Sequence, residues 1–190
     1  RQMRRARRLH PRAPGSTALR RQIAEALPGQ IEHFVSTGLQ FGYLHTSDLV
    51  AHDDPAVRPT ENVVDYIPTT YPGARLPHAV ISTRGLTTGI HDVLHRTSLT
   101  LLTLDDDGWE NELGTHRVAG PGVVVVPVDV PHPAGRRRLI DLLEVGEEGA
   151  VLVRPDGHVA WRTASPASRG IVDLLRFLEQ WNTYYLSAAD

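Results

Sequence analysis

Four consecutive valines, residues 123–126, constrain the fold of this chain more than any other stretch. A valine run without alternating polar residues is the composition expected for an interior strand that is covered on both faces. Pro127 ends the run, because proline has no N–H group to donate to a sheet ladder. Helices on both faces are the simplest cover for such a strand, so the sequence predicts an α/β fold.

A β-hairpin is predicted near the C-terminus. Two apolar runs, residues 150–153 and 158–162, flank Arg154-Pro155-Asp156-Gly157, whose proline and glycine are typical of a tight turn. Ser165 or Ser168 then caps an amphipathic helix. The apolar residues of that helix recur at helical spacing and are Ile171, Leu174, Leu175, Leu178 and Trp181.

The order of these elements indicates a thioredoxin-like mixed sheet with flanking helices. Residues 98–104 are apolar and threonine-rich enough for a buried strand, and Thr87 or Thr88 caps a short helix that ends at His95. Residues 139–145 fit either a helix or a strand. A thioredoxin-like sheet needs a strand, a helix, a second strand, a hairpin and a last helix, although periodicity alone supports only a small α/β domain.

The first part of the chain is predicted to contain one helix and one strand. Apolar residues recur at helical spacing over residues 18–34, so a helix with one buried face is expected, divided or kinked at Pro28 and Gly29. Residues 39–43 alternate between bulky apolar residues and Gln or Gly, which is typical of a strand with one buried face. Residues 53–75 show no sustained period and are rich in proline, so they are expected to form an extended connection.

Composition excludes several classes of protein. The chain has no cysteine, which excludes disulfides, thiolate metal sites and thiol redox chemistry. No apolar run approaches the roughly 18–20 residues that span a bilayer, and no signal-peptide core is present, which favours the cytoplasm. Residues 22–190 carry 12 arginines against 22 acidic residues, so a nucleic-acid-binding surface is not expected. Eight arginines lie in residues 1–21; a phosphate-binding arm and a helix that packs on another domain both fit them.

Four stretches resemble the C-terminal part of the class A FAD-dependent monooxygenases that hydroxylate phenols and polyketides. The most specific covers residues 149–162 and is similar to the family's L-V-R-P-D-G-x-V-A-W-R hairpin. Tyr71-Pro72-Gly73-Ala74-Arg75-Leu76-Pro77-His78 is similar to the family's P-G-x-R-x-P-H segment. Residues 88–104 and 123–128 resemble a capped helix with a following strand, and a further strand. Residues 17–50 match more loosely, including Gly38-Leu39-Gln40-Phe41-Gly42-Tyr43.

The resemblance implies three segments. Residues 1–52 end a middle, substrate-side domain, residues 53–75 form an extended linker, and residues 76–190 form the thioredoxin-like C-terminal domain. The opening at Arg1, within an arginine-rich stretch, favours a piece of a longer chain over the loss of a short leader.

The resemblance also implies cofactors and a reaction that this chain does not carry alone. FAD and NAD(P)H are expected to bind regions outside it, because neither the family's G-x-G-x-x-G turn nor its G-D-A-A-H segment occurs here. The chain is then redox-silent and braces the substrate domain of a monooxygenase that acts on an aromatic or polyketide substrate. Its implied partners are the flavin-binding domain or polypeptide and, for a homodimer, a second copy. The alternative is a stand-alone, redox-inert binding or scaffold protein of the same fold.

Two pairs of residues are the candidate site. Tyr43 and His45 lie in the stretch that resembles the wall of the family's aromatic-binding pocket; a half-buried strand with its polar tips in water is the alternative. Arg75 and His78 are expected to anchor the last domain to the preceding one, since a guanidinium suits bidentate pairing with a carboxylate. No catalytic, cofactor-binding or metal-binding residue is assigned.

Other polar clusters have simpler explanations. His91 and His95 have the i, i+4 spacing that zinc sites use, and His116 or His132 would be needed as a third ligand, but surface histidines explain the pair equally. Residues 105–107 are three aspartates without the glycine and distal glutamate of a calcium loop, so a solvated turn is expected.

Overall fold

The computed structural model describes residues 16–26, 35–53, 57–105, 107–116 and 122–187. Its centre is a mixed four-stranded sheet in the order β4-β3-β5-β6, with β3 parallel to β4 and antiparallel to β5. The strands are β3 (Leu99–Thr103), β4 (Val123–Pro127), β5 (Ala150–Val153) and β6 (Val159–Thr163). The α/β class and the mixed sheet with flanking helices are therefore confirmed.

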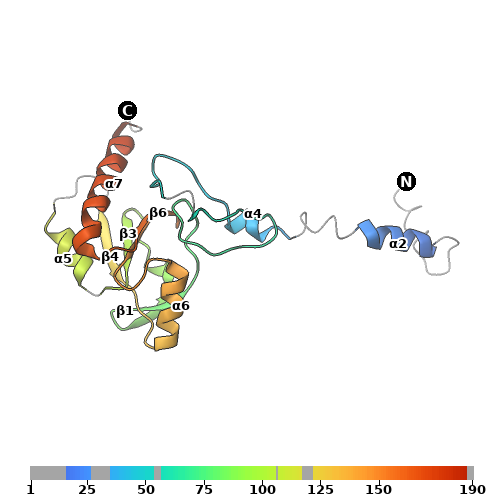
Figure 1. Ribbon diagram of the computed structural model, residues 1–190, viewed down its shortest axis with the longest axis horizontal. Coiled ribbons are helices and arrows are strands. Elements are labelled where there is room, and N and C mark those ends of the chain that lie inside the picture. Colours follow the sequence, from blue (N-terminus) through green and yellow to red (C-terminus); the bar gives the residue numbers. More distant parts are fainter. Residues whose placement is uncertain (1–15, 27–34, 54–56, 106, 117–121, 188–190) are drawn as a thin grey trace.

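Helices cover both faces of this sheet (Figure 1). Helices α5 (Gly108–Gly114) and α7 (Ala167–Ser187) contribute to one hydrophobic core, and α6 (Pro133–Leu143) contributes to a second. Leu101 belongs to the first core and Leu102 to the second, as strand alternation requires. The predicted hairpin and last helix are confirmed, and residues 139–143, which fitted either state, are helical.

The valine run forms a strand, but it is not an interior one. β4 lies at the end of the sheet, and Val124 is 37% exposed, whereas every residue of β3 and β5 is buried. The backbone bonds from Leu99 to Gly122 and from Val128 to Thr103 show that even-numbered residues of β4 face β3. Pro127 therefore directs its missing N–H group to the outer edge, where proline is tolerated.

Two predicted elements near the candidate site are wrong. Residues 37–41 form the short helix α4 (Thr37–Phe41) instead of a strand. The expected helix from Thr87 or Thr88 is replaced by a hairpin of β1 (Val80–Thr83) and β2 (Leu86–Gly89), followed by the 3₁₀ helix η3 (Ile90–Val93). Arg84 and Gly85 both have positive φ angles, 48° and 81°, as a two-residue hairpin turn requires.

The first helix, α2 (Ser16–Ala26), forms within its predicted range but does not bury a face in this chain. The side chains of residues 17–26 are exposed apart from that of Leu19, which is half-buried, and Figure 1 shows the helix standing apart from the sheet. The rest of the predicted helix lies outside the described residues, as do residues 1–15. Among the described helices, none is long and apolar enough to cross a membrane.

The region predicted as a linker has no strand or α-helix among its described residues, 53 and 57–75. Residues 57–68 are mostly exposed, whereas residues 69–74 are buried against the sheet. The domain boundaries at residues 52 and 75 stay a prediction. The residues just before position 76 nevertheless form part of the same packed body.

Candidate functional site

Two segments from outside the sheet pack on the start of β6. Residues 73–76 run antiparallel to it, with bonds from Gly73 N to Val159 O and from Val159 N to Ala74 O, both 2.8 Å. The second segment is residues 43–53, here called the lead-in segment. His45 N donates to Gly73 O at 2.9 Å, and Ala51 N donates to Ala160 O at 2.7 Å. The hairpin thus holds both candidate segments through backbone hydrogen bonds.

Tyr43 and His45 meet a third ring, that of His158. The ring centroids of His45 and His158 are 4.6 Å apart, those of Tyr43 and His45 are 4.9 Å apart, and both pairs are edge-to-face. The Tyr43 hydroxyl lies 3.4 Å from His158 Nε2. Tyr43 is half-buried and His45 is exposed, so this aromatic cluster has one face in solvent.

His158 is the buried member of the cluster. Its side chain is 8% exposed, and its Nδ1 lies 3.2 Å from Asp156 Oδ1 but makes no hydrogen bond with adequate geometry. The same carboxylate oxygen accepts the backbone N–H of His158 at 3.1 Å. Burial lowers the pKa of His158; Asp156 opposes this effect, while His45 and Arg154 add to it. The neutral imidazole is therefore the favoured form in the folded chain.

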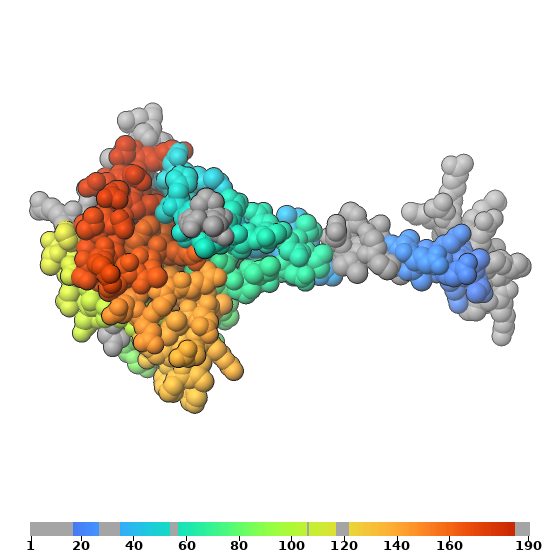
Figure 2. Space-filling view, in the orientation of Figure 1, coloured from blue at the N-terminus to red at the C-terminus, as the bar shows by residue number. Residues whose placement is uncertain are grey.

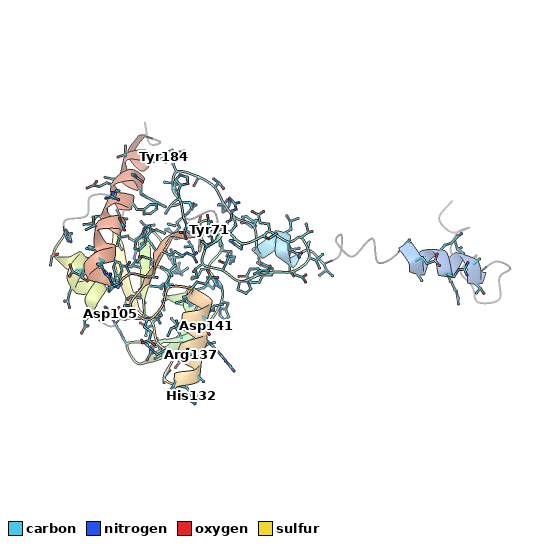
Figure 3. All side chains as sticks on the ribbon, in the orientation of Figure 1. Tyr71, Asp105, His132, Arg137, Asp141 and Tyr184 are labelled. Atoms are coloured by element: carbon cyan, nitrogen blue, oxygen red, sulfur yellow. The ribbon has the colours of Figure 1, made fainter. Side chains whose placement is uncertain are left out.

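A groove of about 200 Å³ lies beside this cluster. Its walls combine lead-in residues with the first residues of the Tyr71–His78 motif. Figure 3 shows Tyr71 at the boundary between the sheet-containing body and the part that carries α4. The lining includes His45, His52, Asp53, Arg58 and Tyr71.

Residues 69–182 match the profile of the family described as aromatic-ring hydroxylase, C-terminal. The chain belongs to this family. Its curated relatives include aklavinone 12-hydroxylase RdmE from Streptomyces purpurascens, which is 33% identical over 158 residues, or 75% of this chain and 27% of that relative. Phenol 2-monooxygenase from Pseudomonas sp. (strain EST1001) is 29% identical over 168 residues, or 80% of this chain and 26% of that relative.

Solved structures agree with this family. The flavin-dependent monooxygenase PieE, solved in complex with FAD and substrate, is 32% identical with a TM-score of 0.69, over 94% of this chain and 32% of that one. Aklavinone-11 hydroxylase, solved with FAD and aklavinone, is 26% identical with a TM-score of 0.59, over 80% of this chain and 27% of that one. The chain thus spans about a third or less of the hydroxylases it resembles.

The other motif residues of this hydroxylase C-terminal region, Arg75 and His78, are exposed. The His78 ring stacks on that of His91 with a centroid distance of 6.0 Å and an interplanar angle of 4°. Burial lowers the pKa of His91, and the positive charges of Arg75 and His78 lower it further. Within the described part of the chain, Arg75 has no ion pair with a carboxylate.

The histidines of the zinc hypothesis have separate roles. His95 Nδ1 accepts the backbone N–H of Ser98 at 3.0 Å, and His132 Nδ1 accepts that of Ala134 at 3.2 Å at the start of α6. No group of three metal-ligating side chains occurs among the described residues. Asp105 lies in a turn before α5, as Figure 3 shows, and Asp106 lies outside the described residues.

Sequence reasoning missed the residues that tie the site together. His158 and Arg162 were assigned only to a turn-flanking strand, and Asp53 only to a linker. Arg162 pairs with Asp53 across 109 positions in the sequence, and Tyr43 meets His158 across 115. The R-P-D-G-x-V-A-W-R similarity was the one available signal, since it ends at Arg162 and contains His158 at its variable position.

The lowered pKa values predict that acid weakens this domain. In the unfolded chain, histidines take up protons near about pH 6.5, whereas His158 and His91 resist protonation in the folded chain. The free energy of unfolding is therefore unaffected by these two residues above about pH 6.5 and falls as the pH drops below it. Asp156, whose pKa is also lowered, loses its contribution only nearer about pH 4. Urea unfolding across this range is expected to show the loss, and a smaller loss for His158→Gln. If the free energy of unfolding falls with pH equally in the variant and the unmodified protein, His158 does not cause the loss.

Proposed function

We propose that this chain is the C-terminal part of an FAD-dependent monooxygenase that hydroxylates an aromatic or polyketide substrate with NAD(P)H and oxygen. The observation that carries the proposal is the likeness to PieE and RdmE, at 32% and 33% identity, over most of this chain. Both are hydroxylases or monooxygenases by name, and PieE was solved with FAD. The flavin, when bound to the whole enzyme, supplies the oxygen-transfer chemistry.

The described residues do not fit FAD themselves. A flavin pyrophosphate binds at a glycine-rich turn between a strand and a helix, where backbone N–H groups face the phosphates. Here the turn between β3 and α5 contains Asp105 and Asp107, whose carboxylates would repel a pyrophosphate. The sequence also lacks G-x-G-x-x-G. The flavin and the nicotinamide cofactor would therefore be held by another part of the protein.

The chain's own contribution is structural support at the edge of the substrate site. In this proposal Tyr43 and His45 face the substrate pocket. His158 of the hairpin contacts Tyr43 from behind, and Gly73, which is itself paired with β6, accepts the backbone N–H of His45. Arg75 and His78 anchor the last domain to the preceding one. Arg75 is exposed and has no carboxylate partner among the described residues, which supports this role.

The finer description of the domain is thioredoxin-like. The order β3-α5-β4-α6-β5-β6-α7, with one parallel pair followed by an antiparallel hairpin, supports it. With no cysteine in the chain, such a domain has no thiol chemistry and acts as a scaffold. Self-association of the native enzyme through this domain remains an expectation, and sedimentation analysis of the native protein checks it.

The native protein that contains this chain is expected to be yellow. Purified without added flavin, it should show flavin absorption bands and release FAD on denaturation. NADH or NADPH oxidation should accelerate when an aromatic substrate is added. A colourless protein that binds no added FAD would contradict the proposal and favour a stand-alone binding or scaffold role.

A further inference from the structure

Arg162 on β6 is the most highly connected side chain in the described part of the candidate site. Its Nε lies 2.9 Å from Asp53 Oδ2, and its Nη1 lies 2.5 Å from Glu144 Oε2 and 3.3 Å from Thr70 Oγ1. The guanidinium carbon lies 5.6 Å from the centroid of the Tyr71 ring. The side chain of Arg162 is only 12% exposed, whereas those of Asp53 and Glu144 are 30% and 39% exposed, so these charge-assisted contacts are partly shielded from solvent.

Glu144 extends the same network to the buried residues before the Tyr71–His78 motif. It ends α6 in the left-handed conformation, at φ 58°. Its Oε2 accepts the Thr69 hydroxyl at 3.0 Å and the Thr70 backbone N–H at 3.3 Å. Arg162 therefore neutralises the charge of a carboxylate that also accepts hydrogen bonds from residues 69 and 70.

The contacts of Arg162 join the two segments that form the groove. Asp53 ends the lead-in segment, and Tyr71 begins the motif segment; both line the groove together with His45. The bond from Ala51 N to Ala160 O places the lead-in segment beside β6 only two residues from Asp53. Figure 2 shows the lead-in region lying against the C-terminal part of the molecule.

We infer that Arg162 is a positioning residue that fixes the lead-in segment, and with it Tyr43 and His45, against the sheet at the edge of the substrate site. The substrate-side half of this inference rests on the proposed function. Lysine does not replace arginine here, because a single ammonium group cannot present planar donors to Asp53, Glu144 and Thr70 at once. In this proposal Arg162 does not touch the substrate; it acts by holding the lead-in segment that carries Tyr43 and His45.

Hydrogen exchange of the native protein tests the positioning, whether or not flavin is bound. In Arg162→Lys, amides of the lead-in segment, including those of His45 and Ala51, are expected to exchange about tenfold faster, since charge-assisted bonds are lost. Arg136→Lys is the matched control, because Arg136 pairs with Asp129 at 2.7 Å and with Leu104 O at 3.1 Å, away from the lead-in segment. That control should leave the exchange of the lead-in segment unchanged.

Asp53→Asn removes the negative charge that pairs with Arg162 on the lead-in segment and leaves Glu144 in place. It is expected to accelerate exchange at Ala51 while leaving the Thr70 amide, which donates to Glu144, at the rate of the unmodified protein. This variant decides the question if Arg162→Lys loosens the whole domain. Lead-in exchange that stays unchanged in Asp53→Asn, or that rises equally in the Arg136 control, would overturn the inference.

Kinetics of the flavin-containing enzyme test the substrate-side half. Arg162→Lys is expected to raise the KM for the aromatic substrate several-fold more than it lowers kcat, because a loose lead-in segment weakens substrate binding before it affects oxygen transfer. Faster amide exchange with an unchanged KM would show that the lead-in segment does not contribute to substrate binding, while still supporting the role of Arg162 in holding that segment. A native protein that binds no flavin would contradict the proposed function, and the hydrogen-exchange experiment would still decide the role of Arg162.

Discussion

Gly73→Ala is expected to destabilise the domain by about 3–5 kcal/mol, because it combines backbone strain with a collision. Gly73 has a φ of 94°, a conformation that side chains with a Cβ rarely adopt. An added Cβ would also lie 2.1 Å from the carbonyl oxygen of His45, which is backbone and cannot swing away. The substitution should therefore expel the lead-in segment from β6 and break the bond from His45 N to Gly73 O.

Gly85→Ala is the matched control for this prediction. Gly85 has a similar φ of 81°, but no atom lies within 4 Å of where its Cβ would be. Its expected cost is the strain alone, about 1–2 kcal/mol. Urea unfolding of the two variants separates strain from collision. Equal losses would show that the close approach of His45 to Gly73 contributes nothing.

The sequence predicts the C-terminal half well because its signals are local. The turn at residues 154–157 and the amphipathic pattern of α7 each lie within one element, and both were confirmed. The valine run specifies a strand for the same reason. Its place at the sheet edge depends on which strands pair, and β3 and β5 occupy the two interior positions instead.

The errors fall where local patterns are short or ambiguous. Alternation over residues 39–43 is also compatible with one helical turn, and the bond from Gly42 N to Gly38 O selects the helix. Thr88 does not cap a helix, because its hydroxyl donates to the Asp92 carboxylate at 3.2 Å. Asp92 instead accepts the backbone N–H of Gly89, at 3.1 Å, where η3 begins. The Arg84-Gly85 turn was the missed signal for the hairpin.

The candidate site is only half visible in the sequence. Resemblance pointed to Tyr43, His45, Arg75 and His78, whose proposed roles still await a test. Their connection to His158, and the pairing of Arg162 with Asp53 and Glu144, depend on contacts between residues far apart in the chain. Turn chemistry explained the neighbouring Arg154 and Asp156 so completely that no spacing rule drew attention to the buried histidine after them.

Trp109→Ala is expected to cost about 3–5 kcal/mol, because Trp109 is completely buried between α5, α7 and β6. Its indole ring meets that of Trp161 edge-to-face at 6.0 Å, and its Nε1 donates to Glu148 O at 3.1 Å. Alanine would leave a cavity and an unpaired carbonyl. Thermal and urea unfolding measure the loss, with Val172→Ala, whose side chain is 57% exposed on α7, as a control of small expected effect.

A double-mutant cycle with Gly170 tests whether this packing is as tight as the structure requires. A Cβ on Gly170 would lie 2.6 Å from Trp109 Cη2, so Gly170→Ala alone should cost about 1–3 kcal/mol despite alanine's better helix propensity. Phenylalanine at position 109 lacks the outer ring atoms, and in Trp109→Phe the same change should cost little or nothing. The coupling arises because the two residues share one space. Additive losses would mean that α7 lies farther from the indole, and that the helix is held against the sheet by its other apolar residues.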